Sequence, residues 1–286
     1  ADPLRVAALK GPTGAGLAYL SDSDGYALEI YDAPDVASAK FISGEVDVAC
    51  VPVNLASVLY NKLEGDVVLL NVNTLGVLYI LDNSNSVQSV QDLAGKTIYA
   101  SGQGSTPEYI LNYILAQNGL TDQVTVSYVG EHAALAAMVA AGEVEIAMLP
   151  EPNVSAVRAK NADVRVALDL TAEWNAVSDT PLAQGCTVAR RAFYEANKQR
   201  VNSLLKDYAA SVEKVNGDEG AADKLAALEI LPSAALAKSA IPQCNIVCIT
   251  GEEAKATMQD MLQTLFDANP ASVGGALPAE DFYAAG

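Results

Sequence analysis

Short apolar, β-branched segments alternate with amphipathic or alanine-rich segments along most of this chain. Short apolar runs predict buried strands, and apolar residues that recur every three or four positions predict helices. Strands are predicted at 4–9, 27–31, 96–100, 124–128 and 181–189 and within 44–52 and 142–150, and helices are predicted to begin at 17 and to cover 35–42, 108–117, 132–141, 191–216, 220–228, 234–240 and 252–268.

An internal repeat organises these elements. Gly44-Glu-Val-Asp-Val-Ala-Cys-Val-Pro52 is echoed by Gly142-Glu-Val-Glu-Ile-Ala-Met-Leu-Pro150. Upstream of each copy, a predicted strand runs into a glycine-rich loop, at residues 10–16 and 101–107. Each half is therefore predicted to be a strand–helix–strand–helix–strand–helix unit.

This alternation predicts an α/β protein with mostly parallel sheets and helices on both faces. We expect two Rossmann-like lobes joined by a two-strand hinge, with a cleft between them. Lobe 1 is predicted to hold residues 1–80 and 187–286 and lobe 2 residues 83–182, with crossings near 76–83 and 182–188. Ligands of such sheets bind at the carboxyl ends of the strands, where both glycine-rich loops fall.

The composition narrows the choice of partners. Asp and Glu number 35 against 17 Lys and Arg, for a formal net charge of -18. Nucleic acids are excluded as partners and anionic membranes are disfavoured, because both require basic residues. No window approaches the ~20 apolar residues of a membrane span. The chain begins Ala1-Asp2-Pro3 without an initiator Met or a signal segment, so we expect a removed targeting segment or a trimmed chain.

The four cysteines, at positions 50, 186, 244 and 248, do not make a disulfide scaffold. On one extended strand Cys244 and Cys248 would lie ~13 Å apart, beyond the ~7 Å limit between the Cα atoms of a disulfide. We expect buried or free thiols. His132 is the single histidine, so neither a two-histidine metal site nor a cofactor is expected.

Five motifs, in this order and spacing, carry a resemblance to a known family. They are residues 10–16, 44–49, Asp92-Leu-Ala-Gly-Lys-Thr97, Gly104-Ser-Thr-Pro-Glu-Tyr-Ile-Leu-Asn-Tyr113 and residues 142–152. The chain resembles solute-binding proteins of ABC importers with the type II periplasmic-binding fold, most closely the subgroup of nitrate, sulfonate, taurine and thiamine-precursor receptors. The resemblance implies an extracytoplasmic, monomeric receptor, free in the periplasm or lipid-anchored, whose lobes close over a small polar or anionic solute and deliver it to a membrane permease.

The first loop offers an anion site at Thr13, Gly14 and Ala15, where a helix begins and its N–H groups and dipole favour negative charge. Lys10 would add a positive charge. Alternatively, Thr13 only caps the helix and Lys10 is solvated.

In the second loop, Ser101, Gly104, Ser105 and Thr106 present hydroxyl and amide groups to a ligand. Ser105 and Glu108 also fit a capping box, which would explain Glu108 without a ligand. No Gly-Lys-Ser or Gly-Lys-Thr follows, so the loop is not a P-loop.

Polar residues at other strand ends complete the predicted site. Asn54 and Asn153 contact the ligand or cap helices, whereas Asn73 and Thr74 interrupt a buried run and need backbone or ligand partners. Glu151 replaces Val53 of the first repeat, and it accepts a hydrogen bond from the ligand or sits at a helix N-terminus. Three aromatic residues are noted: Tyr79 and Tyr109, which stack on a ligand ring or belong to the core, and Trp174, which we expect to be structural.

We do not expect an enzyme, because His132 opens an alanine-rich helix as a predicted surface residue and a Ser–His–Asp arrangement would depend on it. Dehydratase-like enzymes of the same fold are the alternative, and a ligand-sensing module is a third hypothesis. The solute class also stays open. No arginine lies in the candidate loops, which weakens a nitrate or sulfonate ligand and leaves a neutral or heteroaromatic one.

Overall fold

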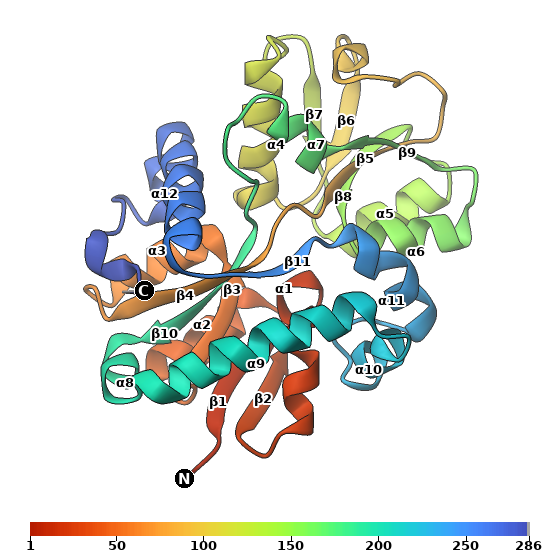
Figure 1. Cartoon of the computed structure of the whole chain (residues 1–286). Coiled ribbons are helices and arrows are strands. Elements are labelled where there is room, and N and C mark those ends of the chain that lie inside the picture. The colour runs from red at the N-terminus through yellow and green to blue at the C-terminus, as the bar shows by residue number, and fades with distance from the viewer. Residues whose placement is uncertain (285–286) are drawn as a thin grey trace. The chain divides into compact units, whose positions relative to one another are not determined.

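The structure, a computed structural model that describes residues 1–284, divides into two compact units (Figure 1). Unit 1 comprises Ala1–Leu75 and the chain from Ala183 onward, and unit 2 comprises Gly76–Leu182. The chain thus crosses after Leu75 and again after Leu182. Residues 76–80 belong to unit 2 and not, as predicted, to the first lobe, because β5 (Leu78–Asp82) pairs with strands of unit 2.

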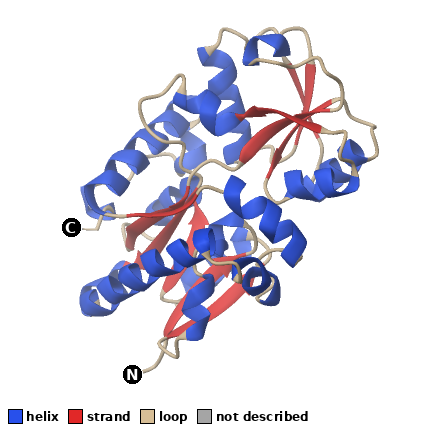
Figure 2. Cartoon of the chain, turned by 45° about the vertical axis from the view of Figure 1, so that its right-hand side comes forward, coloured by secondary structure: helices blue, strands red, loops and turns tan. Residues whose placement is uncertain are grey.

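A six-stranded sheet in the order β11-β4-β10-β3-β1-β2 forms the centre of unit 1 (Figure 2). Strand β10 is antiparallel to both of its neighbours, whereas β1 is parallel to β2 and β3. All eight residues of β4 are buried, as expected for a strand covered on both faces. The strands are β1 (Leu4–Leu9), β2 (Tyr26–Tyr31), β3 (Val48–Pro52), β4 (Val67–Thr74), β10 (Gly185–Arg190) and β11 (Ile246–Ile249).

Helices cover both faces of this sheet. Helix α9 (Lys198–Gly217) passes over one face, and α2 (Pro34–Ser43) and α3 (Val53–Lys62) lie behind it in Figure 1. Helix α9 buries residues spaced three and four apart, from Val201 to Val215, which is the pattern of a helix with one apolar face. The remaining elements of unit 1 are α1 (Pro12–Ala15), α8 (Arg191–Ala196), α10 (Ala221–Ala227), α11 (Ala234–Ala240), α12 (Gly251–Ala268) and the 3₁₀ turns η1 (Ala18–Asp22), η3 (Ile241–Gln243), η4 (Pro270–Val273) and η5 (Glu280–Phe282).

The single helix predicted at 191–216 is in fact two helices. Asn197 separates α8 from α9, and its side-chain amide donates to the carbonyl of Phe193 at 3.0 Å. An asparagine that bonds the preceding turn in this way ends a helix, because it offers the backbone a local alternative.

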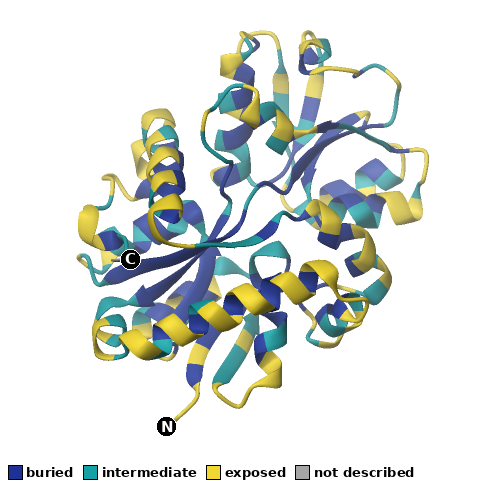
Figure 3. Cartoon of the chain, in the orientation of Figure 1, coloured by how far each residue is buried: buried dark blue, intermediate teal, exposed yellow. Residues whose placement is uncertain are grey.

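Unit 2 has a five-stranded sheet in the order β7-β6-β8-β5-β9, with β5 antiparallel to β8 and β9. Its core strands and inner helix faces are buried (Figure 3). Besides β5, the elements are β6 (Thr97–Ala100), β7 (Thr125–Tyr128), β8 (Ile146–Pro150), β9 (Arg165–Asp169), α4 (Thr106–Gln117), α5 (His132–Ala140), α6 (Asn153–Lys160), α7 (Leu170–Asn175) and the 3₁₀ turn η2 (Val90–Leu93).

The two units repeat one topology. The parallel order β2-β1-β3 in unit 1 corresponds to β7-β6-β8 in unit 2, and helices follow each strand in the predicted order. The strand beside β3 in unit 1 is β10, and the strand beside β8 in unit 2 is β5; both are antiparallel to that neighbour. Each is the first strand that the chain forms after a crossing. The α/β fold predicted from the repeat is therefore confirmed.

All four thiols are free, as predicted. Burial raises the pKa of Cys50 to about 11, so this thiol stays protonated at neutral pH. Cys248 lies on β11, whereas Cys244 precedes the strand.

Candidate functional site

The carboxyl ends of β6, β7 and β8 lie at one edge of the unit 2 sheet, because these strands are parallel. Ser101 follows β6 directly, His132 begins the helix after β7, and Glu151 follows β8. Chain segments far apart in the sequence therefore place polar side chains at one edge, where ligands of such sheets bind.

Ser101 and His132 form the main polar contact of this edge. The Ser101 hydroxyl lies within hydrogen-bond distance of His132 Nδ1. Ser101 is 1% exposed and His132 is half-buried, and burial lowers the pKa of the imidazole. The expectation that His132 is a surface residue is therefore wrong. The pairing depends on the alignment of Ala100 with Tyr128 across β6 and β7, which no local sequence pattern reveals.

The turn before α4 is held by hydrogen bonds other than the predicted capping box. Ser105 is the N-cap residue but makes no side-chain cap, since its hydroxyl donates to the carbonyl of Gly102 at 2.6 Å. The Glu108 carboxylate accepts from the N–H of Gly104 at 2.6 Å. Thr106 is buried in the first turn of the helix. The acid therefore serves the loop itself, and a second anion at Gly104 would compete with it.

Glu151 is 2% exposed and lies at the start of α6. Its two carboxylate oxygens accept hydrogen bonds from the backbone N–H of Ser155 at 2.9 Å and from the Ser155 hydroxyl at 2.6 Å. Burial raises the pKa of Glu151, and the bonds from Ser155 oppose that rise. Glu151 therefore contacts the N-terminal turn of α6, as one of its two predicted roles requires.

Fixed positive charge is confined to the opposite edge of the unit 2 sheet. Arg165 begins β9 and pairs with Asp82 at 2.9 Å, at the amino ends of the parallel strands. Lys96 directly precedes β6, and the other two cations lie in the last turn of α6. At the carboxyl edge, His132 is thus the residue of Gly76–Leu182 that can become a cation. The four Lys and Arg residues of this unit are Lys96, Arg158, Lys160 and Arg165.

In unit 1, the first glycine-rich loop does not open a long helix. Helix α1 has only four residues and gives way to the turn η1, so few peptide dipoles add up at its start. Thr13 lies inside α1, where Gly11 is the N-cap, so it does not cap the helix. Gly14 and Ala15 are buried. Lys10 forms an exposed ion pair with Asp32 at 2.7 Å, so its charge is already partly compensated.

The other predicted residues of unit 1 have protein partners. Asn73 and Thr74 end β4 and are 1% exposed each; the Asn73 amide donates to the Thr187 hydroxyl at 3.0 Å. Asn54 donates to the carbonyl of Ser272 at 3.2 Å, in the C-terminal segment. In unit 2, Asn153 is the first residue of α6. Neither Asn54 nor Asn153 is an N-cap, because Pro52 and Pro152 hold those positions.

The aromatic residues divide between core and edge. Tyr79 is buried in the unit 2 core. Trp174 is buried, packs on Tyr113 with ring centroids 4.6 Å apart and donates to the carbonyl of Thr180 at 3.1 Å, so its structural role is confirmed. Tyr128, at the end of β7, has a buried hydroxyl with no partner among the described residues. Burial, with smaller effects from Glu108 and Tyr109, raises the pKa of Tyr128 to about 12.

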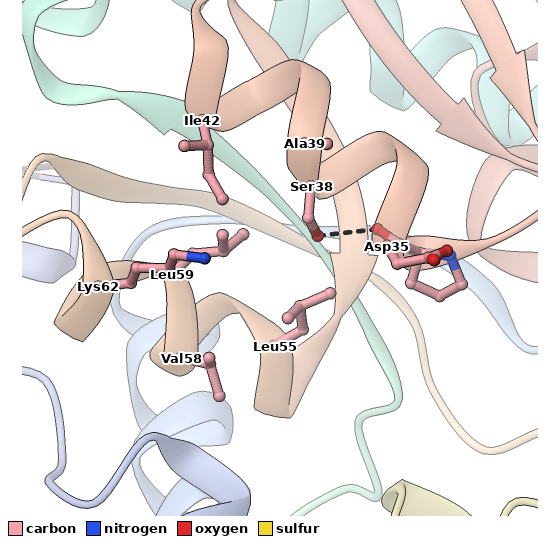
Figure 4. A pocket seen from close by; sticks show the side chains of 9 residues that line it. Asp35, Ser38, Ala39, Ile42, Leu55, Val58, Leu59 and Lys62 are labelled. Carbon is pink, nitrogen blue, oxygen red and sulfur yellow. Dashed lines mark hydrogen bonds between the residues drawn. The ribbon is translucent and has the colours of Figure 1, made fainter.

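A separate surface groove of about 590 Å³ lies between α2 and α3 in unit 1 (Figure 4). Its walls are mainly apolar, with Asp35 and Lys62 among the lining residues. The Ser38 hydroxyl in this groove donates to the carbonyl of Pro34 at 2.8 Å. The groove contains none of the predicted ligand-binding residues.

The described residues, 1–284, contain no cluster of three or more His, Cys, Asp or Glu side chains suited to a metal ion. None of their helices is both long and apolar enough to cross a membrane.

Comparison with known families gives one match over most of the chain. The family model described as the periplasmic substrate-binding protein of phosphonate ABC transporters matches residues 13–234. A search of curated proteins finds no match.

Solved structures share the fold over nearly the whole chain. A crystal structure of an ABC transporter from Parabacteroides distasonis is 25% identical, with a TM-score of 0.86 and coverage of 99% of both chains. The periplasmic aliphatic sulphonate binding protein SsuA from Escherichia coli is 20% identical, with a TM-score of 0.76 and coverage of 98% of this chain and 93% of that one. The desulfurization enzyme DSZB is 14% identical, with a TM-score of 0.67 and coverage of 100% and 97%. The fold therefore occurs in both binding proteins and an enzyme.

Proposed function

Because the chain belongs to the phosphonate-binding family of ABC-transporter periplasmic substrate-binding proteins, we propose that it binds a small organic oxyanion of the phosphonate or sulfonate type. Membership of the family makes it an extracytoplasmic solute-binding receptor, with a small-molecule ligand and an ABC permease as partners. The oxyanion class rests on the phosphonate of the family description and on the aliphatic sulphonate named for the neighbour from Escherichia coli. We also propose that the receptor acts as a monomer.

The observation that carries this proposal is the Ser101–His132 pair at an edge without Lys or Arg. When Ser101 donates to Nδ1, the ring proton lies on Nε2, which is a donor for a ligand oxygen. An oxyanion nearby favours the imidazolium form, because an opposite charge raises the pKa of a base. Nδ1–H then donates to Ser101, and the serine hydroxyl is released to donate to the ligand. The pair thus supplies two donors in response to a negative charge.

We propose further that Ser101 and His132 bind and do not catalyse. A serine nucleophile needs a histidine that is held by a third group. Within residues 1–284 no carboxylate bonds the His132 ring. The dehydratase-like alternative predicts slow consumption of a bound ligand. Incubation of the protein with its best ligand, followed by mass spectrometry, would favour that alternative if a product appeared.

A thermal-shift screen tests the ligand class. The panel holds methylphosphonate, ethanesulfonate, alanine and a pyrimidine, each at about 100 times a micromolar dissociation constant. A ligand at that excess stabilises the folded state by ~2.7 kcal/mol, which is a readily measured shift. We expect shifts with the two oxyanions. Shifts with alanine or the pyrimidine alone would replace the oxyanion by a zwitterionic or heteroaromatic solute.

A further inference from the structure

A chain of buried hydrogen bonds in unit 1 ends at the first glycine-rich loop. The Thr74 hydroxyl shares its one hydrogen between two acceptors, Asn73 Oδ1 at 2.8 Å and, more weakly, the carbonyl oxygen of Pro12 in that loop at 3.4 Å. The Asn73 amide donates to the Thr187 hydroxyl at 3.0 Å, and Thr187 donates to the hydroxyl of Tyr208 at 3.4 Å. All four side chains are at most 1% exposed. They come from β4, β10 and α9, so this series of hydrogen bonds links three elements to one loop.

Two glycines allow the loop to lie directly on this chain. A Cβ on Gly185 would stand 2.6 Å from Asn73 Oδ1, 3.0 Å from Thr74 Oγ1 and 3.1 Å from Thr13 Cγ2. A Cβ on Gly16, at the other end of the loop, would stand 3.2 Å from the ring of Tyr208. The loop is therefore in contact with both ends of the hydrogen-bonded chain.

These contacts leave little freedom for the polar groups involved. A buried hydroxyl or amide without a partner is costly, so each member keeps the partner that the next one offers. The orientation of Asn73 is fixed at both ends of its amide, since Oδ1 faces Thr74 and Nδ2 donates to Thr187.

We propose that Asn73, Thr74, Thr187 and Tyr208 position residues 11–16 for the solute and do not contact it themselves. This inference builds on the proposed solute-binding function, because it assigns loop 11–16 to the binding site. It also changes the role predicted for Asn73 and Thr74 from ligand contact to positioning. Loss of the Thr74 hydroxyl would free the Pro12 carbonyl and let the loop move while its own residues stay unchanged.

Hydrogen exchange of the ligand-free protein tests the positioning directly. The variants are Thr74→Val, which keeps the shape and removes the hydroxyl, and Thr74→Ser, which restores a hydroxyl. Thr257→Val is the matched control, because Thr257 is a buried threonine of α12 in the same unit. We expect exchange of the amides at 11–17 to quicken about tenfold in Thr74→Val alone, with β1 unchanged. Equal exchange at 11–17 in Thr74→Val, Thr257→Val and the parent protein would overturn the proposal.

Ligand affinity gives the second measurement, with methylphosphonate as the probe. Thr74→Val should weaken its binding about tenfold, and Thr74→Ser should restore most of the loss. If Thr74→Val does not fold, Tyr208→Phe is the second variant, because it removes only the last hydroxyl of the hydrogen-bonded chain. It should still quicken amide exchange at 11–17. Unchanged exchange in Tyr208→Phe would overturn the proposal. Absence of methylphosphonate binding in the parent protein would contradict the proposed ligand class, while the exchange result would still decide the positioning role.

Discussion

At the scale of single residues, Glu151 combines deep burial with a helix-end contact. Both of its carboxylate oxygens bond Ser155, yet burial raises its pKa. The folded protein therefore binds a proton more readily than the unfolded chain. The stability that this difference provides is fully present below the unfolded-state pKa and is lost as pH rises from that value through the folded-state pKa.

Glu151→Gln should consequently raise the midpoint of thermal unfolding at pH 8. The midpoint should also depend less on pH between pH 5 and 8. Glutamine has nearly the same shape and can still bond Ser155. We also expect less than a twofold change in ligand affinity, because Ser155 occupies both oxygens. The measurement is thermal unfolding at the two pH values, followed by a ligand titration. A lower midpoint at pH 8, or a tenfold loss of affinity (~1.4 kcal/mol), would return Glu151 to the role of ligand contact.

His132 gives the second prediction for a single residue. Burial lowers its pKa, so the folded protein resists its protonation. Stability should decrease as pH falls from ~6.5, the ordinary value, toward the folded-state pKa. An oxyanion reverses this preference, so ethanesulfonate, whose single charge is the same at both pH values, should bind about tenfold more tightly at pH 6 than at pH 8.

His132→Gln should remove this pH dependence, as measured by titration calorimetry at several pH values. Lys96→Gln is the control, because Lys96 lies at the opposite edge of the same sheet, and it should retain the dependence. If both variants showed the same pH dependence of affinity as the parent protein, protonation of His132 would not contribute to binding of the oxyanion.

At the scale of elements, the turn into α4 depends on Glu108 and not on its N-cap residue. Glu108→Ala should lower the free energy of unfolding by ~1 kcal/mol, since it leaves the Gly104 N–H without its acceptor. Glu131→Ala is a matched control, because Glu131 is the N-cap of α5 without a side-chain cap. Chemical denaturation of both variants would show whether the acid supports the turn, and equal losses would refute that role.

The elements also show what the sequence could predict. The parallel strands and their alternation with helices along the chain follow from apolar runs, glycine-rich loops and the repeat of 44–52 at 142–150, all of which can be read from the sequence. The partners of β5 had no such signal, because an apolar run does not specify the sheet to which it belongs. A helix is predicted to begin at Leu17, but the structure has the 3₁₀ turn η1 there. The reason is related, because the apolar residues Leu17–Leu20 suit a 3₁₀ turn as well as an α-helix.

The sequence predicts where the candidate site residues lie relative to the strands, but it does not predict their hydrogen-bond partners. Ser101, Ser105 and Glu151 do follow strands at a carboxyl edge. Their partners, His132, Gly102 and Ser155, depend on strand pairing and on the path of the backbone within a few residues. The hydrogen-bonded chain from Tyr208 to Pro12 joins residues from four separate segments, so no spacing in the sequence could reveal it.

At the scale of the whole molecule, two units of one topology are linked by two crossings. Each unit presents a loop after its first parallel strand, residues 10–16 and 101–106. We have proposed that loop 11–16 and the Ser101–His132 pair each serve solute binding, so affinity for the solute should fall when either is altered.

Titration calorimetry of the parent protein with methylphosphonate and ethanesulfonate at pH 6.5 tests this claim most directly. The account predicts one site per chain for at least one of the two oxyanions, with affinity reduced about tenfold by Thr74→Val in unit 1 and by His132→Gln in unit 2. No heat of binding with either oxyanion, or a single site insensitive to both substitutions, would contradict it.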